Sequence, residues 1–317
     1  MKNRLRKLLG TPYIQIIALS VLLVLGSLLV SGGALFPTPA LYLGELPAPT
    51  SPDNPFSLVA MQKRLPPEAI RRVQRFIYYY QVEHKIGFEG SLARSNRYIE
   101  LFRHIFHEQG MPEELAFLPL IESGFNEHAV SPAKAVGVWQ FMEATGTRFD
   151  LLSTPWTDAK RDPIQSTKAA SRYLRHLYNM FGNWELALAA YNSGEGTVMR
   201  AIRENKKAHL PTHYWALDLP DETRGYVPAF LAAVIIAKNP AAFGFHRVPF
   251  APKLAYDQIK VQPGTSLSSL ASQLNIDMEE LLELNPELLT GIVPPGKGAY
   301  LLKVPKGLRA NQTRKVG

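Results

Sequence analysis

Three short segments carry polar side chains where a packed helix would be expected to carry apolar ones. They are Glu122-Ser123, Gly137-Val-Trp-Gln140 followed by Phe141, and Ala190-Tyr-Asn192. A carboxylic acid can donate and accept a proton, while flat aromatic faces and amide groups are what sugar rings require. Together the three segments indicate acid–base chemistry, and the second and third favour a carbohydrate as the substrate.

Glu122 is the candidate acid because of where its helix ends. The segment PEELAFLPLIES is apolar after its two opening glutamates until it reaches Glu122, and Ser123 and Gly124 follow. A carboxyl group at the end of an apolar helix is expected to be partly desolvated, which raises its pKa and keeps it protonated near neutral pH. Ser123 is placed to orient it. In the alternative interpretation, Glu122 lies at a frayed helix end in water.

Gln140 and Asn192 are the candidate binding amides. Gln140 follows Trp139 and stands three residues after Gly137, where the backbone can turn or let a ligand approach. Asn192 ends the segment ELALAAYN, with Tyr191 beside it. A simpler interpretation makes Trp139 a core residue and Asn192 a helix cap. The glycines after Asn192 come without the lysine of a phosphate-binding loop, so we expect no nucleotide site.

Composition restricts the other kinds of chemistry. The 317 residues contain no cysteine, which excludes disulfides, thiolate zinc sites, cysteine nucleophiles and a lipidated N-terminal cysteine. His104 and His107 lie about one helical turn apart, but no third ligand accompanies them, so we expect neither a metal nor another cofactor. The 35 Lys and Arg against 27 Asp and Glu give a net charge of +8, which favours an anionic partner.

The first 65 residues predict export and a spacer. Basic residues among the first seven precede an uncharged, mostly apolar stretch from Ile14 to Val30. Residues 1–36 therefore read as a signal sequence or a signal anchor, with the N-terminus in the cytoplasm and the bulk of the chain exported. Residues 37–65 are rich in proline and poor in charge, which is typical of an extended linker.

Hydrophobic periodicity predicts the elements that must position the candidate residues. From residue 66 to 250, apolar residues recur at spacings of three and four, which indicates one mostly α-helical domain. From 251 to 305, the strand-like segments LAYDQIKV and AYLLKV enclose two short amphipathic helical segments, which predicts a small βααβ module. Residues 306–317 form a basic tail whose default interpretation is a solvated segment. The expected fold class is mostly α.

The four motifs of the helical domain resemble those of the soluble-lytic-transglycosylase family, in the lysozyme-like superfamily. In that family a catalytic glutamate precedes a serine, a Gly-x-x-Gln segment follows, then Ala-Tyr-Asn, and a later Tyr-Val completes the site. Here they are Glu122-Ser123, Gly137 to Gln140, Ala190-Tyr191-Asn192 and Tyr226-Val227. Phrases such as SLARSNRY, GVWQFM and LPDETRGYVP resemble the membrane-bound D type in particular. Where that type often has Asp-Glu-Arg-Arg-Asp-Pro, this chain reads Asp-Ala-Lys-Arg-Asp-Pro over 158–163.

The resemblance implies a lysozyme-like fold and non-hydrolytic cleavage of the β-1,4 bond from N-acetylmuramic acid to N-acetylglucosamine. Glu122 would protonate the bridging oxygen and then take the proton of the C6 hydroxyl as that oxygen attacks C1, which leaves a 1,6-anhydro end. Ordinary glycosidases need two carboxylates for this bond, whereas this route needs one. The implied substrate-binding residues are Ser123, Trp139, Gln140, Tyr191, Asn192 and Tyr226.

The C-terminal module resembles a LysM domain, a carbohydrate-binding unit, in VQPGTSLSSLASQLNIDMEELLELNP. The resemblance implies that two loops bind N-acetylglucosamine, and the residues concerned are Gly264, Thr265, Ser266, Asn285 and Pro286. In the alternative interpretation this is a degenerate copy that only packs on the catalytic domain.

Two other functions stay open on sequence alone. A catalytically silent peptidoglycan-binding scaffold would keep the same cleft, and a hydrolytic muramidase would add water at the same bond. The resemblance and the export signal imply peptidoglycan strands as the partner and the bacterial cell envelope, in the periplasm, as the location. The N-terminal segment would anchor the protein in the membrane unless cleavage released it. Nucleic acid is not expected, because the chain is exported and its Lys and Arg are scattered.

Overall fold

The computed structural model describes residue 56 and residues 65–308. The predicted signal segment at 1–36, almost all of the predicted linker at 37–65 and most of the basic tail at 306–317 lie outside these residues. Those three interpretations therefore stay predictions. Among the described residues, no helix combines the length and the apolar character needed to cross a membrane.

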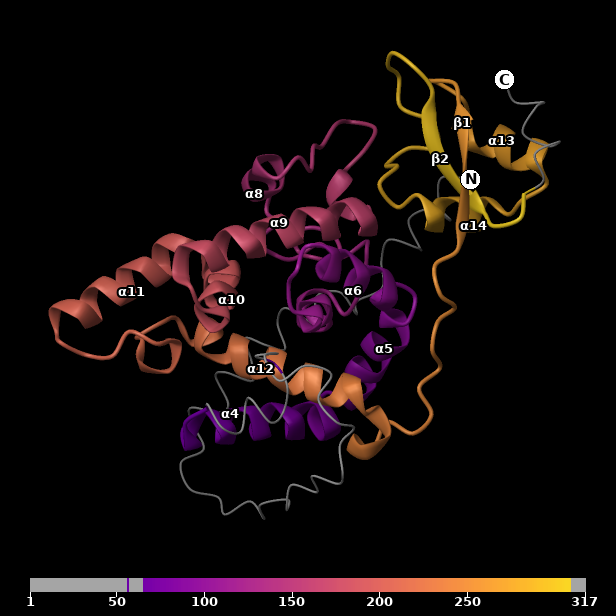
Figure 1. Ribbon diagram of the computed structural model, residues 1–317. Coiled ribbons are helices and arrows are strands. Elements are labelled where there is room, and N and C mark those ends of the chain that lie inside the picture. The colour runs from indigo at the N-terminus through magenta and orange to yellow at the C-terminus, as the bar shows by residue number, and fades with distance from the viewer. Residues whose placement is uncertain (1–55, 57–64, 309–317) are drawn as a thin grey trace. The chain divides into compact units, whose positions relative to one another are not determined.

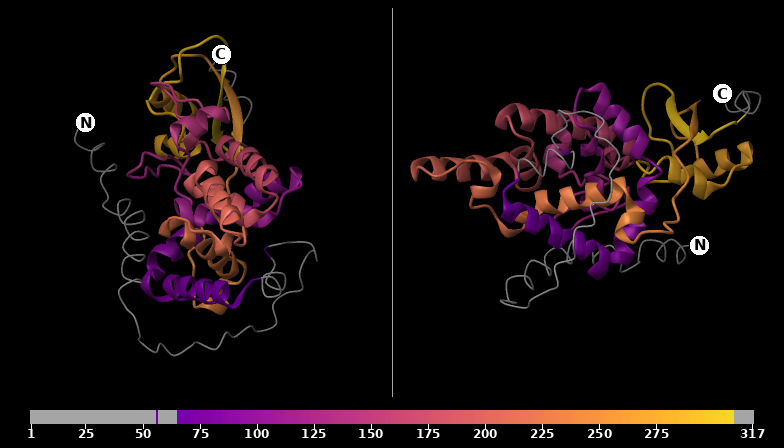
Figure 2. Two further views of the ribbon diagram at one scale, coloured as in Figure 1. Left: turned by 90° about the vertical axis from the view of Figure 1, so that its left-hand side faces the viewer. Right: turned by 60° about the horizontal axis from the view of Figure 1, so that its bottom comes forward.

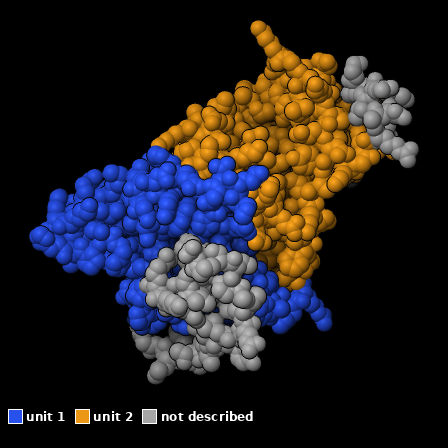
Figure 3. All heavy atoms as spheres, in the orientation of Figure 1, with its two compact units in different colours: residues 1–88, 106–121, 174–247 blue, residues 89–105, 122–173, 248–317 orange. Residues whose placement is uncertain are grey.

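The described chain forms two compact units, which Figure 3 colours separately. The first contains the residues up to 88, then 106–121 and 174–247, and the second contains 89–105, 122–173 and the residues from 248 onward. Four helices contribute residues to both units, and they are α5 (Lys85–Ser95), α6 (Ile99–Glu108), α7 (Pro119–Glu122) and α9 (Pro163–Phe181). The chain therefore passes repeatedly from one unit to the other.

The first unit is built around α12 (Asp221–Lys238). Helices α4 (Pro67–Tyr78) and α10 (Trp184–Ser193) both pack against α12, as Figure 1 shows and Figure 2 repeats from two other directions. Helix α12 is apolar on nearly all sides and is buried from Tyr226 to Ile236, as expected of a central helix. The unit also contains η1 (Tyr79–Glu83), η2 (Glu113–Phe117), α11 (Glu195–Lys207), η4 (Tyr214–Ala216) and η5 (Pro240–Phe243).

The two ends of α10 are fixed by local chemistry. At the start, the side-chain oxygen of Asn183 accepts a hydrogen bond of 3.0 Å from the backbone N–H of Leu186, which caps the helix. At the end, Gly194 adopts a φ of +82°, a conformation that favours glycine, and α11 begins at the next residue. Asn192 therefore lies in the last turn of α10, two residues before a sharp change of direction.

The helical part of the second unit has an aromatic core. Phe102 of α6 lies 5.8 Å from Phe125 and 5.7 Å from Trp139, measured between ring centroids, and all three side chains are fully buried. These rings join α6 to the two segments that follow Glu122 and precede Gln140. Two shorter elements complete this part, and they are α8 (Glu143–Arg148) and η3 (Ala159–Arg161).

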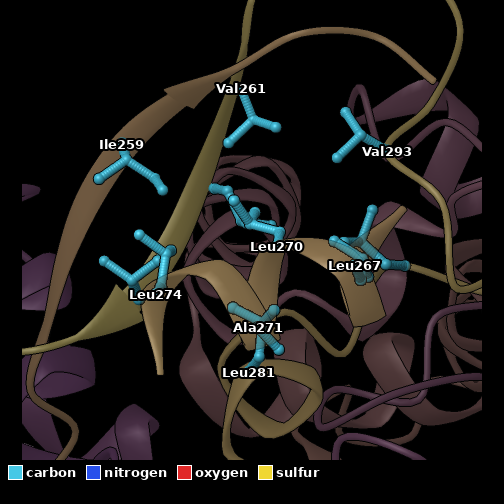
Figure 4. Packing of buried hydrophobic residues seen from close by; sticks show 11 residues of the cluster. Ile259, Val261, Leu267, Leu270, Ala271, Leu274, Leu281 and Val293 are labelled. Atoms are coloured by element: carbon cyan, nitrogen blue, oxygen red, sulfur yellow. The ribbon is translucent and has the colours of Figure 1, made fainter. Parts of the chain in front are cut away.

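The C-terminal module has the predicted strand–helix–helix–strand order. Its elements are β1 (Tyr256–Val261), α13 (Leu267–Leu274), α14 (Met278–Leu284) and β2 (Tyr300–Pro305). The strands pair antiparallel, from Tyr256 opposite Pro305 to Val261 opposite Tyr300. Figure 4 shows how side chains from β1 and both helices converge on one small apolar core. The mostly α fold with a small βααβ module is thus confirmed.

Candidate active site

Glu122 is the last residue of α7, a helix of four residues, and its side chain is half-buried. The backbone turns immediately afterwards, because Gly124 and Phe125 both adopt positive φ angles, +62° and +59°. A positive φ is unusual for phenylalanine, so the turn is held by the buried packing of the Phe125 ring. Glu122 therefore stands on a fixed turn and is shielded from solvent in part, as the sequence predicted.

Ser123 connects this turn to the loop of residues 136–141, called here the 136–141 loop. Its hydroxyl donates a hydrogen bond of 2.8 Å to the backbone oxygen of Val138 and accepts one of 3.2 Å from the N–H of Asn126. The Ser123 side chain is only 3% exposed. Ser123 therefore ties the turn after Glu122 to the segment that carries Gln140.

The 136–141 loop is a tight turn with an unusual backbone. Val136 and Phe141 exchange two backbone hydrogen bonds, each 3.0 Å long. Gly137 has a φ of +81° and Gln140 one of +50°, and the Gln140 amide nitrogen donates a 3.0 Å bond back to the Gly137 oxygen. A glutamine in the left-handed region costs about 1 kcal/mol or more, and such strained residues cluster at functional sites.

Gly137 also lies in direct backbone contact with η3. A Cβ atom added at Gly137 would stand 2.0 Å from the backbone oxygen of Lys160, far inside any allowed contact. The 136–141 loop therefore rests on the Lys160 peptide, and only glycine permits this approach.

Trp139 is a core residue, which corrects the expectation that it binds the substrate. Its exposed fraction is 0%, and its indole N–H donates a 2.8 Å hydrogen bond to the hydroxyl of Thr167. An indole that is buried and hydrogen-bonded on the inside presents no face to a ligand. Trp139 thus supports the loop from within, as the simpler interpretation had it.

Arg94 is a residue at this site that the sequence analysis did not single out. Its Nε donates a 2.7 Å hydrogen bond to the backbone oxygen of Gly124, two residues after Glu122. Burial lowers the pKa of Arg94, while Glu127 acts in the opposite direction. The phrase SLARSNRY contains this arginine, but nothing in its spacing indicates that it reaches the turn after Glu122.

The remaining candidates, Tyr191, Asn192 and Tyr226, belong to the first unit. The side-chain oxygen of Asn192 accepts a 2.7 Å bond from the Thr223 hydroxyl, and its nitrogen donates a 3.1 Å bond to Glu222. The start of α12 therefore fixes which way the Asn192 amide faces. Tyr191 is half-buried and Tyr226 is 8% exposed on α12. Glu222 and Thr223, which hold the Asn192 amide, are residues that sequence reasoning missed.

The residues expected to bind glycan in the C-terminal module fall into two groups. Gly264, Thr265 and Ser266 form the turn before α13, where Ser266 caps the helix and Thr265 donates to the Gln262 oxygen. Asn285 is fully buried, and its amide makes three hydrogen bonds inside the module, one to Leu281 and two to Lys303. Pro286 is also buried. This burial corrects the expectation that Asn285 and Pro286 contact a bound sugar.

No metal site accompanies these residues. Among the described residues, no group of three or more His, Asp and Glu side chains is arranged to hold an ion. His107 instead lies 3.1 Å from Glu113, measured from Nδ1 to Oε1.

Comparison with known families and proteins now identifies the two parts of the chain. Residues 104–211, which include Glu122, Gln140 and Asn192, match the transglycosylase SLT domain, and residues 255–315 match the LysM-like domain of lytic transglycosylase MltD.

Three relatives show how far the similarity extends. The membrane-bound lytic murein transglycosylase D of Escherichia coli K12 is 38% identical over 200 residues, which cover 63% of this chain and 44% of that protein. The soluble lytic murein transglycosylase of the same strain is 31% identical over 142 residues, 43% of this chain and 22% of the relative. The membrane-bound lytic murein transglycosylase C of Photorhabdus laumondii is 29% identical over 128 residues, 36% of each chain. The chain spans less than half the length of these relatives. With an SLT domain followed by a LysM-like domain, it belongs to the lytic transglycosylase family.

Proposed function

We propose that this protein is a peptidoglycan lytic transglycosylase that uses Glu122 as its acid and base. The observation that carries the proposal is the position of Glu122 inside the matched SLT domain, half-buried at the end of α7 and fixed by the bond from Ser123 to Val138. A carboxyl group held on a rigid turn can meet the same substrate oxygen in every catalytic cycle. The names of the relatives support murein as the substrate.

The proposed reaction needs one carboxyl group and no water. Glu122 donates its proton to the oxygen between N-acetylmuramic acid and N-acetylglucosamine, and the bond from that oxygen to C1 breaks. The resulting carboxylate then takes the proton of the C6 hydroxyl while the C6 oxygen bonds to C1. The proton count of Glu122 is restored, and the strand ends in a 1,6-anhydro ring.

Gln140 and Asn192 are the proposed positioning amides, with Tyr191 and Tyr226 as further substrate-binding residues. The fixed orientation of both amides supports this role. The Gln140 side chain is hydrogen-bonded to the Gly137 oxygen of its own loop, and the Asn192 side chain is hydrogen-bonded to Thr223 and Glu222. Amides of fixed direction favour one orientation of an N-acetyl sugar, because donor and acceptor must each meet their counterpart.

We also propose that the protein acts in the periplasm, at the membrane. The basic N-terminus followed by the apolar stretch from Ile14 to Val30 supports export, and it would anchor the protein if it is not cleaved.

The test is product chemistry on purified peptidoglycan. The full-length protein is expected to release muropeptides that are lighter by one water than hydrolysis products and that resist borohydride reduction, as mass spectrometry would show. Glu122→Gln is expected to lower the rate by at least about 100-fold, because the acid and base is lost. Glu204→Gln, at an exposed glutamate of α11 in the same matched domain, is the control and should keep most of the activity. Reducible products would mean a muramidase instead, and binding without products would mean a scaffold.

A further inference from the structure

The LysM-like module is attached to the helical part of the second unit by backbone pairing. The backbone N–H of Asp158 donates a 2.9 Å bond to the oxygen of Glu287, and the N–H of Leu289 donates a 2.9 Å bond to the oxygen of Trp156. Thr157 and Leu288 form the antiparallel bridge between these two bonds. The segment after α14 thus adds one short strand to the segment before η3.

A buried ion cluster lies beside this pairing. The Nζ of Lys303, on β2, stands 2.8 Å from Asp162 and 2.9 Å from Glu287, and all three side chains are less than 10% exposed. Burial alone would lower the pKa of Lys303, but the two carboxylates raise it above its ordinary value. The hydroxyl of Tyr300 donates a 3.2 Å bond to Glu287. Removing one partner of such a cluster leaves an uncompensated buried charge, so the docked arrangement depends on all three side chains being present.

The chain that leads into the module is fixed as well. The backbone N–H groups of Ala251 and Leu254 donate to the oxygens of Ala93 and Arg97, at 3.0 and 2.8 Å. The Asn96 side chain donates a 2.7 Å bond to the Ala251 oxygen. The residues before β1 therefore run along α5 and the turn after it, and do not form a free tether.

The same 158–162 segment that receives the module also supports the 136–141 loop. Asp162 contacts Lys303 through one oxygen and caps α9 through the other, which accepts bonds from Ile164 and Gln165. Lys160 is 2% exposed, and its Nζ lies 2.8 Å from Asp158. Its backbone oxygen is the atom on which Gly137 rests.

These contacts form one continuous path. It runs from Lys303 through Asp162 to the Lys160 peptide, and from there through Gly137 and the next peptide to Ser123. None of these contacts depends on a glycan bound to the module. The loop after α14 takes part in them, and its Asn285 side chain is buried and hydrogen-bonded to Lys303.

We propose that the LysM-like module, through Lys303 and the 158–162 segment, positions the 136–141 loop for catalysis. The proposal rests on the proposed lytic transglycosylase function. Lys303 is a positioning residue, because it acts on the reacting groups only through the loop. A small displacement of that loop is expected to lower kcat while leaving the affinity for the strand nearly unchanged, because catalysis is more sensitive to geometry than binding is.

The test compares Lys303→Met with Lys260→Met in the full-length protein. Lys260 is an exposed lysine on the neighbouring strand β1 and serves as the matched control. Lys303→Met is expected to lower kcat roughly tenfold with KM within about twofold, while Lys260→Met changes neither. Hydrogen exchange should be faster at the amides of Gly137 and Phe141 in Lys303→Met only. A raised KM with an unchanged kcat, or unchanged exchange in the loop, would overturn the proposal.

A reversible disulfide provides the rescue experiment. Thr157 and Leu288 face each other in a non-hydrogen-bonded pair, the closest kind of antiparallel pair, and the chain has no other cysteine. Thr157→Cys with Leu288→Cys should therefore lock the module in place even in the Lys303→Met background, and should keep that variant folded. Oxidation is expected to restore kcat and loop protection, and reduction to remove both. Failure of oxidation to restore them would contradict positioning.

The exchange readout separates the two proposals. If Lys303→Met loosens the loop but the unsubstituted protein makes no anhydro products, the positioning contact stands and the proposed function fails. If the products form and the loop is unaffected, the function stands and the positioning role fails.

Discussion

At the scale of single residues, Gly137 is a position where the backbone conformation and a neighbouring peptide both restrict the residue type to glycine. Its φ of +81° disfavours any other residue, and an added Cβ would overlap the Lys160 oxygen at 2.0 Å. We therefore expect Gly137→Ala to lower the free energy of unfolding by about 3 kcal/mol. Activity should fall as well, because the 136–141 loop must move to accommodate the added methyl group. Urea denaturation followed by tryptophan fluorescence would measure the stability change.

Gly196→Ala is the matched control for that substitution. Gly196 lies near the start of α11 with no atom within 4 Å of an added Cβ and no positive φ. Alanine is a better helix former than glycine, so this variant should be as stable as the parent or more stable by up to about 1 kcal/mol. Equal losses at both positions would show that the contact with Lys160 is not what restricts Gly137.

Sequence reasoning reached some residues of the site and not others, for physical reasons. The half-buried position of Glu122 was predictable because an acid at the end of an apolar run is conspicuous in a one-dimensional pattern, and its catalytic role stays a proposal. Trp139 was misplaced because an aromatic residue beside an amide fits a sugar cleft and a core equally well, and only packing distinguishes them. Arg94 and Thr223 were missed because each acts through a hydrogen bond to a residue about 30 positions away.

At the scale of elements, the contact between β2 and the loop after α14 has a defined pH dependence. Burial raises the pKa of Glu287 above its ordinary value of 4.5, and Asp162 acts in the same direction, while Lys303 opposes both. The folded protein therefore binds this proton more tightly than the unfolded chain does. The contribution of Glu287 to stability is fully present below the ordinary value and declines as pH rises through the raised, folded-state pKa.

Glu287→Gln should remove this decline, because glutamine does not titrate. We expect the melting temperature of the parent to fall relative to that of Glu287→Gln as pH rises from about 4.5. Thermal scans of both proteins over a series of buffers would measure the difference. Glu283→Gln, on the exposed side of α14, is the control and should follow the parent curve. A difference that stays constant with pH would contradict the shift.

The elements themselves were largely predictable, whereas their docking was not. Apolar residues at spacings of three and four identify α9, α10 and α12, and the change of pattern near residue 251 identifies the βααβ module. The bridge between Thr157 and Leu288 joins positions 131 residues apart through backbone groups, which every sequence has. Nothing in side-chain periodicity can predict such a pairing.

At the scale of the whole molecule, the module and the helical part of the second unit should behave as one cooperative body. Their shared ion cluster and paired backbones predict that 122–173 and 255–305 unfold in a single calorimetric transition. In Lys303→Met the module should melt separately and at lower temperature, while Lys260→Met keeps the single transition. Two transitions in the unsubstituted protein would contradict this expectation.

The family, by contrast, was predictable at this scale because its motifs are few, short and correctly ordered along the chain. The motifs could not predict which of the matching residues are exposed and which are buried. Asn285 and Pro286 occupy the positions expected of sugar-binding residues, yet both are buried, and the Asn285 amide is hydrogen-bonded inside the module.

The ion cluster of Lys303, Asp162 and Glu287 has a consequence for recombination between relatives. Lys303 comes from the LysM-like module and Asp162 from the helical part, so a recombinant must receive both residues to keep the buried ion pair. A chimera that receives a foreign LysM module at residue 250 would bury Asp162 without its partner, whereas one that exchanges 153–163 along with the module would keep the pair. The smallest exchangeable part of this protein is therefore larger than its smallest domain.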